Sequence, residues 1–217
     1  MIKNIFFDFD GTLADTTEGI VRCTLATLEQ LGLPASTPER IRSVIGLPLT
    51  GCFERGTDTP PERIDEACIT YRRMFNEIAI PYTKLYPGTK ETLSELQARG
   101  LQLALCTSRS NNSLNALLQV LGIRSYFSAI VTNQDVTHPK PAPDIALLAL
   151  ERLCARPDET LVVGDTVYDL KMGRSAYCRT CGVTWGNQDR AQLQIEAPDL
   201  IIDDFRELAR FLQTNAV

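Results

Sequence analysis

Short, largely apolar runs recur along the chain, and each one ends in polar residues. These runs cover residues 5–7, 101–106, 129–131 and 161–163. Short apolar runs bounded by turn residues are typical of strands buried on both faces, as in a parallel sheet. The pattern therefore predicts a set of core strands whose carboxyl ends carry polar side chains.

Helical patterns separate the later runs, at residues 88–98, 113–121 and 143–153. The segment 113–121 carries leucines at intervals of three and four positions, and Gly100 and Gly122 follow the first two segments, where a left-handed helix cap is common. Strands that alternate with helices predict an α/β fold with a doubly wound parallel sheet, a Rossmann-like core.

The segment 15–82 interrupts this alternation with helical patterns at residues 20–31, 38–44 and 62–80. Thr37 before Pro38 is a plausible N-cap with proline at the first helical position. We therefore expect an all-helical cap domain at 15–82, inserted into an α/β core formed by 1–14 and 83–217.

Composition and charge narrow the range of partners. The 217 residues carry a net charge of −5, so we expect neither nucleic acid nor a membrane as partner. No apolar run approaches the roughly 18 residues of a membrane span. The seven cysteines are an odd, scattered set, which indicates reduced thiols and a cytoplasmic protein. Such an acidic protein needs a cation or a local basic group to receive an anionic substrate.

Carboxylates and hydroxyls follow the first two runs. Asp8 and Asp10 follow residues 5–7, and Thr107 and Ser108 follow residues 101–106. Ligands of open α/β sheets bind at the carboxyl ends of the strands. Two carboxylates this close repel each other unless a cation neutralises them or one takes a proton, and Mg²⁺ suits such oxygen ligands. Turn formation and capping are the alternative interpretation of each pair alone.

A lysine and two further acids complete the set of candidates. Lys140 lies in a loop stiffened by alternating prolines and would serve as a point charge for phosphate, although alone it could equally be a surface charge. Asp165 and Asp169 follow the run at 161–163 and lie one helical turn apart. Asp165 is placed to complete a metal site with Asp8, and Asp169 would ligate the metal or orient its water.

These four elements, in this order, resemble the signature of the haloacid dehalogenase-like phosphatases. They read DFDGTLAD at 8–15, LCTSR at 105–109, HPKPAPD at 138–144 and VVGDTVYD at 162–169. The core motifs extend over nearly the whole chain, and the helical segment fits the cap that follows the first motif in this family. The resemblance implies a magnesium-dependent phosphatase that acts on a small phosphorylated metabolite.

The resemblance also implies roles for individual residues. Asp8 would be the nucleophile that forms an aspartyl phosphate, and Asp10 the general acid and base. Thr107, Ser108 and Lys140 would hold the phosphoryl oxygens. The residues that would bind Mg²⁺ are Asp8, Asp10 through its backbone carbonyl, Asp165 and Asp169. The chemistry is consistent, because a carboxylate attacks phosphorus only if the negative charge of the phosphate is offset.

Two segments are similar to phosphoglycolate phosphatases: IGLPL at 45–49 and GVTWG at 182–186. This resemblance implies phosphoglycolate as the expected substrate. Gly46 would let the cap loop approach the active site closely. Arg42 and Arg109 are weak candidates for binding a substrate carboxylate, with surface charge as the alternative interpretation.

Other functions stay open. A sugar phosphomutase of the same family would use the same Asp8 and Asp10, and an inorganic pyrophosphatase is a further alternative. Dehalogenases lack the second acid, and phosphonate-cleaving members need a cap lysine that the segment 15–82 does not contain. A non-enzymatic receiver domain is less favoured, because its phosphorylated acid follows the third strand. We expect a monomer or a homodimer.

Overall fold

Six parallel strands form the central sheet, in the order β5–β4–β1–β6–β7–β8. The computed structural model describes residues 1–214. The strands are β1 (Asn4–Phe7), β4 (Gln102–Thr107), β5 (Ala129–Thr132), β6 (Thr160–Gly164), β7 (Arg179–Val183) and β8 (Leu200–Ile202). Every residue of β1 is buried, so the strand that carries the first motif also lies deep in the fold.

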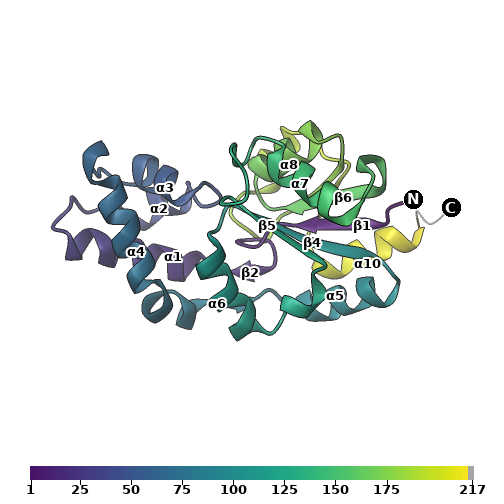
Figure 1. Ribbon diagram of the computed structural model, residues 1–217, viewed down its shortest axis with the longest axis horizontal. Coiled ribbons are helices and arrows are strands. Elements are labelled where there is room, and N and C mark those ends of the chain that lie inside the picture. Colours follow the sequence, from purple (N-terminus) through teal and green to yellow (C-terminus); the bar gives the residue numbers. More distant parts are fainter. Residues whose placement is uncertain (215–217) are drawn as a thin grey trace.

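Helices cover both faces of this sheet (Figure 1). They are α5 (Thr89–Ala98), α6 (Asn111–Leu121), α7 (Asp144–Leu153), α8 (Val167–Ser175), α9 (Arg190–Gln194) and α10 (Phe205–Thr214). Phe6 packs in a cluster with residues of α7 and α8, whereas Ile5 and Phe7 pack in a cluster with residues of α5, α6 and α10. Alternate residues of a strand point to opposite faces, so β1 contributes to both halves of the core. The predicted doubly wound sheet is confirmed.

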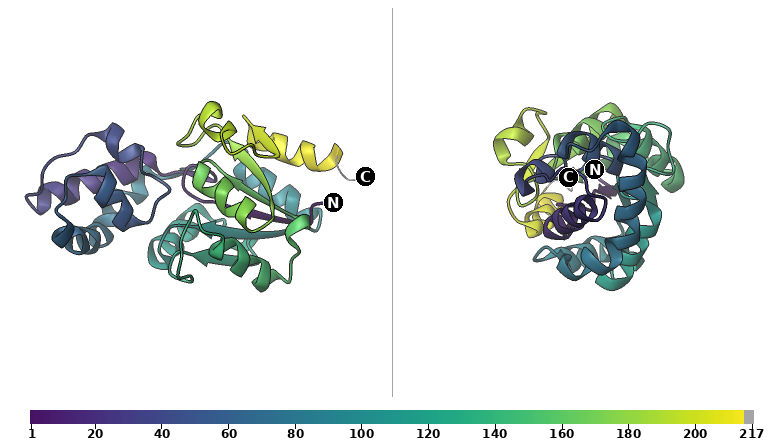
Figure 2. Two further views of the ribbon diagram at one scale, coloured as in Figure 1. Left: turned by 90° about the horizontal axis from the view of Figure 1, so that it is seen from above. Right: turned by 90° about the vertical axis from the view of Figure 1, so that its left-hand side faces the viewer.

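The cap is a group of helices beyond the carboxyl ends of the strands (Figures 1 and 2). Its helices are α1 (Thr17–Gln30), α2 (Pro38–Arg42), α3 (Leu49–Gly56) and α4 (Ile64–Ile78). Thr37 caps α2 as predicted, since its hydroxyl accepts a hydrogen bond from the Arg40 backbone N–H at 3.2 Å. Phe53, Tyr71 and Phe75 pack edge to face or tilted inside the cap, which supplies the cap's own apolar interior.

A two-stranded antiparallel ribbon joins the cap to the sheet domain. It pairs β2 (Ala14–Asp15) with β3 (Lys84–Leu85). The chain therefore enters and leaves the cap through neighbouring backbone segments. We propose that the chain is divided into a cap at 15–82 and a core at 1–14 and 83–217.

Two further features bear on the expectations from composition. All seven cysteines are unpaired in the structure. Within residues 1–214, no helix combines the length and the apolar character that crossing a bilayer requires.

Candidate active site

The carboxyl ends of β1 and β4 face the cap across a cavity of about 480 Å³. The core lines this cavity with Asp8, Asp10, Thr107, Ser108, Arg109 and Asn133, among others. The cap lines it with Ile20, Ile45, Gly46, Leu47, Tyr71 and Phe75, among others. The cavity thus has a polar floor and a largely apolar roof.

Asp8 and Lys140 form the centre of the floor. The Lys140 ammonium donates hydrogen bonds to Asp8 Oδ1 at 2.5 Å and to Asp169 Oδ1 at 2.6 Å, and all three side chains are buried. Burial raises the pKa of Asp8 well above its ordinary value, against the opposing pull of Lys140. Burial also disfavours the charge on Lys140, but Asp169 and Asp8 outweigh it and raise the pKa of Lys140. The lysine therefore stays cationic beside the carboxylates.

Three buried carboxylates converge where the sequence predicts a metal. Oxygen atoms of Asp8, Asp165 and Asp169 all lie within 4.8 Å of one another. Burial and the neighbouring Asp169 raise the pKa of Asp165 to about 7, which is the mark of carboxylates that need a compensating cation. An all-oxygen donor set of this kind fits a hard divalent cation such as Mg²⁺. The carboxylate of Asp10 is not in this cluster.

Asp165 is fixed by groups that sequence reasoning missed. Thr12 donates to Asp165 Oδ1 at 3.1 Å, and the backbone and side-chain N–H groups of Asn187 donate to Oδ2 at 2.7 and 2.8 Å. Gly11 has φ +83°, and a Cβ on it would lie 2.1 Å from Asp165 Oδ2. Only glycine permits this conformation together with this approach. Asn187 follows β7, so its position after a strand was the available signal.

Asp169 has two partners on opposite oxygens. Its Oδ2 accepts from the Thr166 backbone N–H at 3.1 Å and from the Thr166 hydroxyl at 2.7 Å, and its Oδ1 accepts from Lys140. Thr166 and Asp169 form a capping box at the start of α8. The capping interaction thereby orients the carboxylate toward the site.

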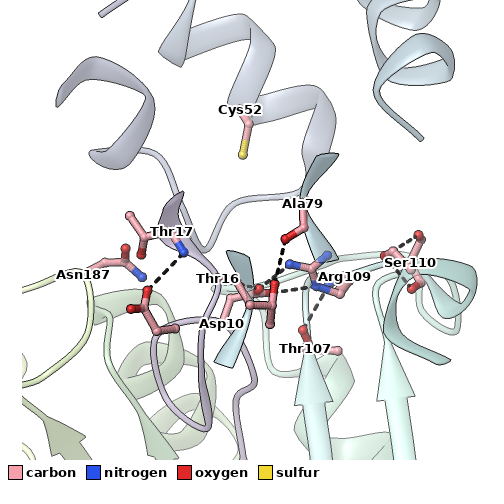
Figure 3. Close-up of polar contacts among 12 residues, drawn as sticks. Asp10, Thr16, Thr17, Cys52, Ala79, Thr107, Arg109, Ser110 and Asn187 are labelled. Carbon is pink, nitrogen blue, oxygen red and sulfur yellow. Dashed lines mark hydrogen bonds and ion pairs between the residues drawn. The ribbon is translucent and has the colours of Figure 1, made fainter. Parts of the chain in front are cut away.

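Asp10 is paired with Arg109. The guanidinium donates from Nε to Asp10 Oδ2 at 3.0 Å and from Nη2 to Oδ1, and Thr16 donates to Oδ1 at 2.6 Å. Figure 3 shows Asp10 and Arg109 turned toward each other, with Cys52 of the cap above them. The Arg109 side chain is only 7% exposed and lies over the Phe75 ring at 4.8 Å. The interpretation of Arg109 as a surface charge is therefore wrong.

Thr107 ends β4 beside this pair, and Ser108 follows it. Thr107 is buried, and its hydroxyl accepts from the Arg109 backbone N–H at 3.2 Å. The Ser108 hydroxyl is buried and has no hydrogen-bond partner within residues 1–214. An unsatisfied buried hydroxyl is costly, so this group is well suited to receive an oxygen of a bound substrate.

The two cap candidates differ in position. Gly46 lines the cavity with φ +103°, and a Cβ on it would lie 3.3 Å from Thr166 Cγ2, so the cap loop does approach the core closely there. Arg42 does not line this cavity. Its side chain is 45% exposed and faces Glu39 and Glu18 at 3.6 and 4.0 Å. The geometry gives Arg42 no contact with the site.

The order of these elements matches a known family over most of the chain. Residues 5–183 match the model of the haloacid dehalogenase-like hydrolases. The chain belongs to this family. A structure of a haloacid dehalogenase-like family hydrolase from Streptococcus pneumoniae superposes with a TM-score of 0.87 at 28% identity, covering 98% of this chain and 99% of that one.

Several named relatives are similar to this protein over nearly its whole length. "Probable phosphatase IndB" of Dickeya dadantii is 39% identical, covering 94% of this chain and 90% of the relative. Pyrophosphatase PpaX of Anoxybacillus flavithermus is 34% identical, covering 97% of each. Phosphoglycolate phosphatase of Escherichia coli is 31% identical, covering 95% and 91%. The predicted enzyme class, a phosphatase of this family, is confirmed, whereas the names of the relatives point to different substrates.

Proposed function

We propose that this protein is a Mg²⁺-dependent phosphatase that transfers the phosphoryl group of a small metabolite to Asp8 and then to water. One observation carries the proposal: Asp8 lies at the carboxyl end of β1, bonded to Lys140 and clustered with Asp165 and Asp169, on the floor of a cavity roofed by the cap. A carboxylate in that position has a cation beside it and room in front of it for a substrate.

In the first step, a carboxylate oxygen of Asp8 forms a bond to phosphorus while the bond from phosphorus to the leaving oxygen breaks. Asp10 gives a proton to that leaving oxygen. In the second step, water attacks phosphorus, Asp10 takes the proton of the water, and the bond to Asp8 breaks. Thr107, Ser108 and Lys140 hold the phosphoryl oxygens in both steps.

Asp8, Asp165 and Asp169 would hold Mg²⁺, together with the backbone carbonyl of Asp10. When bound, the ion offsets the negative charge of the carboxylates and the phosphoryl group. Lys140 adds a second, permanent positive charge on the same floor. Thr12 and Asn187 keep Asp165 in place by hydrogen bonds to both of its oxygens.

Phosphoglycolate is the substrate that we favour. The resemblance of residues 45–49 and 182–186 to segments of phosphoglycolate phosphatases supports this choice. Pyrophosphate is the second candidate, because relatives named pyrophosphatase are 33–35% identical. A sugar phosphomutase is the third, since it would require the same Asp8 and Asp10.

The test is phosphate release from phosphoglycolate, pyrophosphate, sugar phosphates and nucleotides, with and without Mg²⁺. We expect Mg²⁺-dependent turnover that is lost in Asp8→Asn and strongly reduced in Asp10→Asn. Asp158→Asn is the matched control, because within residues 1–214 this exposed aspartate forms an ion pair with surface Arg156 alone. If no compound released phosphate while a sugar phosphate was isomerised in the same tubes, the phosphomutase would replace the phosphatase.

A further inference from the structure

Four charged residues line the cavity: Asp8, Asp10, Arg72 and Arg109. Asp8 is bonded to Lys140, and Asp10 is bonded to Arg109 through both carboxylate oxygens. Arg72, in contrast, is an exposed residue at the edge of the cavity, and it has no hydrogen bond or ion pair with any residue between 1 and 214. The cavity therefore holds one guanidinium whose charge is not matched by the protein.

Arg72 reaches the cavity because of how α4 packs. Tyr71 and Phe75 of α4 are buried, and both line the cavity. Arg72 and Asn76 lie one position further along, so they form a second pair at i and i+4 on the cavity side. Arg73, the next residue, is exposed as Arg72 and Asn76 are, but it does not line the cavity.

The floor offers a polar group to the same space. Asn133 lies just after β5 and lines the cavity, and its Oδ1 atom is buried without a hydrogen-bond partner in the described part of the chain. A buried amide oxygen without a partner costs free energy until it accepts a hydrogen bond. The substrate is thus expected to meet polar groups from both the cap and the core beyond the phosphoryl site.

We propose that Arg72, with Asn76 beside it, binds a second anionic group of the substrate, a carboxylate or a second phosphate carried by the leaving group. This inference rests on the proposed phosphatase function and narrows its substrate class. An arginine fork binds such planar or tetrahedral anions through paired N–H groups. A sugar phosphate, whose leaving group is neutral, would leave the charge of Arg72 unmatched, so phosphoglycolate and pyrophosphate are favoured over the phosphomutase substrate.

Two non-hydrolysable ligands of equal length test the proposal by binding alone. 3-Phosphonopropionate carries a phosphonate and a carboxylate, whereas propylphosphonate carries the phosphonate only. Calorimetric titration of each ligand, in the presence of Mg²⁺, compares the intact protein with Arg72→Gln and with the matched control Arg73→Gln. We expect the intact protein to bind 3-phosphonopropionate about tenfold or more tightly than propylphosphonate, as for a charge-assisted hydrogen-bonded pair. The ratio of the two dissociation constants should fall to near one in Arg72→Gln and should be unchanged in Arg73→Gln.

Each other outcome has a distinct meaning. Equal binding of both ligands by the intact protein would overturn the role of Arg72 and leave the phosphatase intact. An equal loss of preference in Arg72→Gln and Arg73→Gln would reduce the effect to the general charge of the cap and overturn the specific subsite. Binding of neither ligand would contradict the phosphoryl site itself, and with it the proposed function.

Discussion

At the level of single residues, the contact between Asp10 and Arg109 involves the proposed general acid and base and should also stabilise the fold. Both side chains are largely buried, and the guanidinium uses two N–H groups on one carboxylate. Removal of one partner of a buried ion pair leaves the other charge uncompensated and typically costs about 3–5 kcal/mol. Arg109→Met should therefore lower the free energy of unfolding by about that amount, as measured by urea titration.

The double variant is the control for this prediction. Arg109→Met combined with Asp10→Asn removes both charges, so it should recover much of the stability without recovering activity. Equal stability losses in the single and double variants would show that the pairing itself contributes nothing.

A second residue-scale prediction concerns Gly46. Its φ of +103° is strained for any side chain, and a Cβ would press on Thr166, so Gly46→Ala should cost about 1–2 kcal/mol. The same change should raise KM, because the cap loop is held away from the core. Gly32→Ala is the matched control, since Gly32 also has a positive φ (+60°) but nothing lies within 4 Å of its added Cβ. Gly32→Ala should lower the stability and leave KM unchanged. A raised KM in Gly32→Ala as well would show that the contact between the Gly46 loop and Thr166 is not what changes KM.

At the level of elements, the start of α8 combines a helix cap with a candidate ligand. Thr166→Val removes the hydroxyl that holds Asp169, which should cost about 1 kcal/mol of stability. It should also weaken Mg²⁺ activation, because Asp169 loses its orientation. Asp189→Ala removes the capping box of α9 and should cost similar stability without affecting the Mg²⁺ concentration for half-maximal activity. An unchanged Mg²⁺ requirement in Thr166→Val would show that the capping box of α8 does not affect the metal site.

Elements with a strong local signal could be predicted from the sequence. The four predicted strands coincide with β1, β4, β5 and β6 to within a residue or two, because a strand buried on both faces must be apolar throughout. The helix α3 was not predicted, since Gly51 and Gly56 lower the helix propensity of its eight residues. The short strand β8 was not predicted either, because three residues are too few to distinguish a strand from a loop by their pattern of apolar positions.

The candidate site shows the same limit. The acids that end strands could be placed together from topology alone, because parallel strands deliver their carboxyl ends to one edge. Thr12 and Asn187 could not, because their contact with Asp165 depends on how two loops meet. Sequence also offered Arg42 as the cap arginine, whereas Arg72 lines the cavity. Which side of a cap helix faces the core is decided by packing, here by Tyr71 and Phe75.

At the level of the whole molecule, we expect the cluster of buried carboxylates to oppose folding in the absence of a cation. Mg²⁺ at a hundredfold excess over its Kd should stabilise the protein by about 2.7 kcal/mol. For a chain of this size that corresponds to a rise in Tm of roughly 5–10 °C. Asp165→Asn should reduce the rise measured by thermal unfolding, and exposed Asp58→Asn should retain it. A similar rise in both variants would assign the stabilisation to non-specific ionic effects.

The ribbon of β2 and β3 makes the two ends of the cap neighbours in space. A segment whose ends meet in this way can be replaced by a longer, shorter or differently shaped one without moving the strands on either side. The core would catalyse the same reaction, and the substituted cap would change the substrate specificity. Exchange of the cap between relatives at this ribbon is thus a direct route to new substrates on an unchanged catalytic floor.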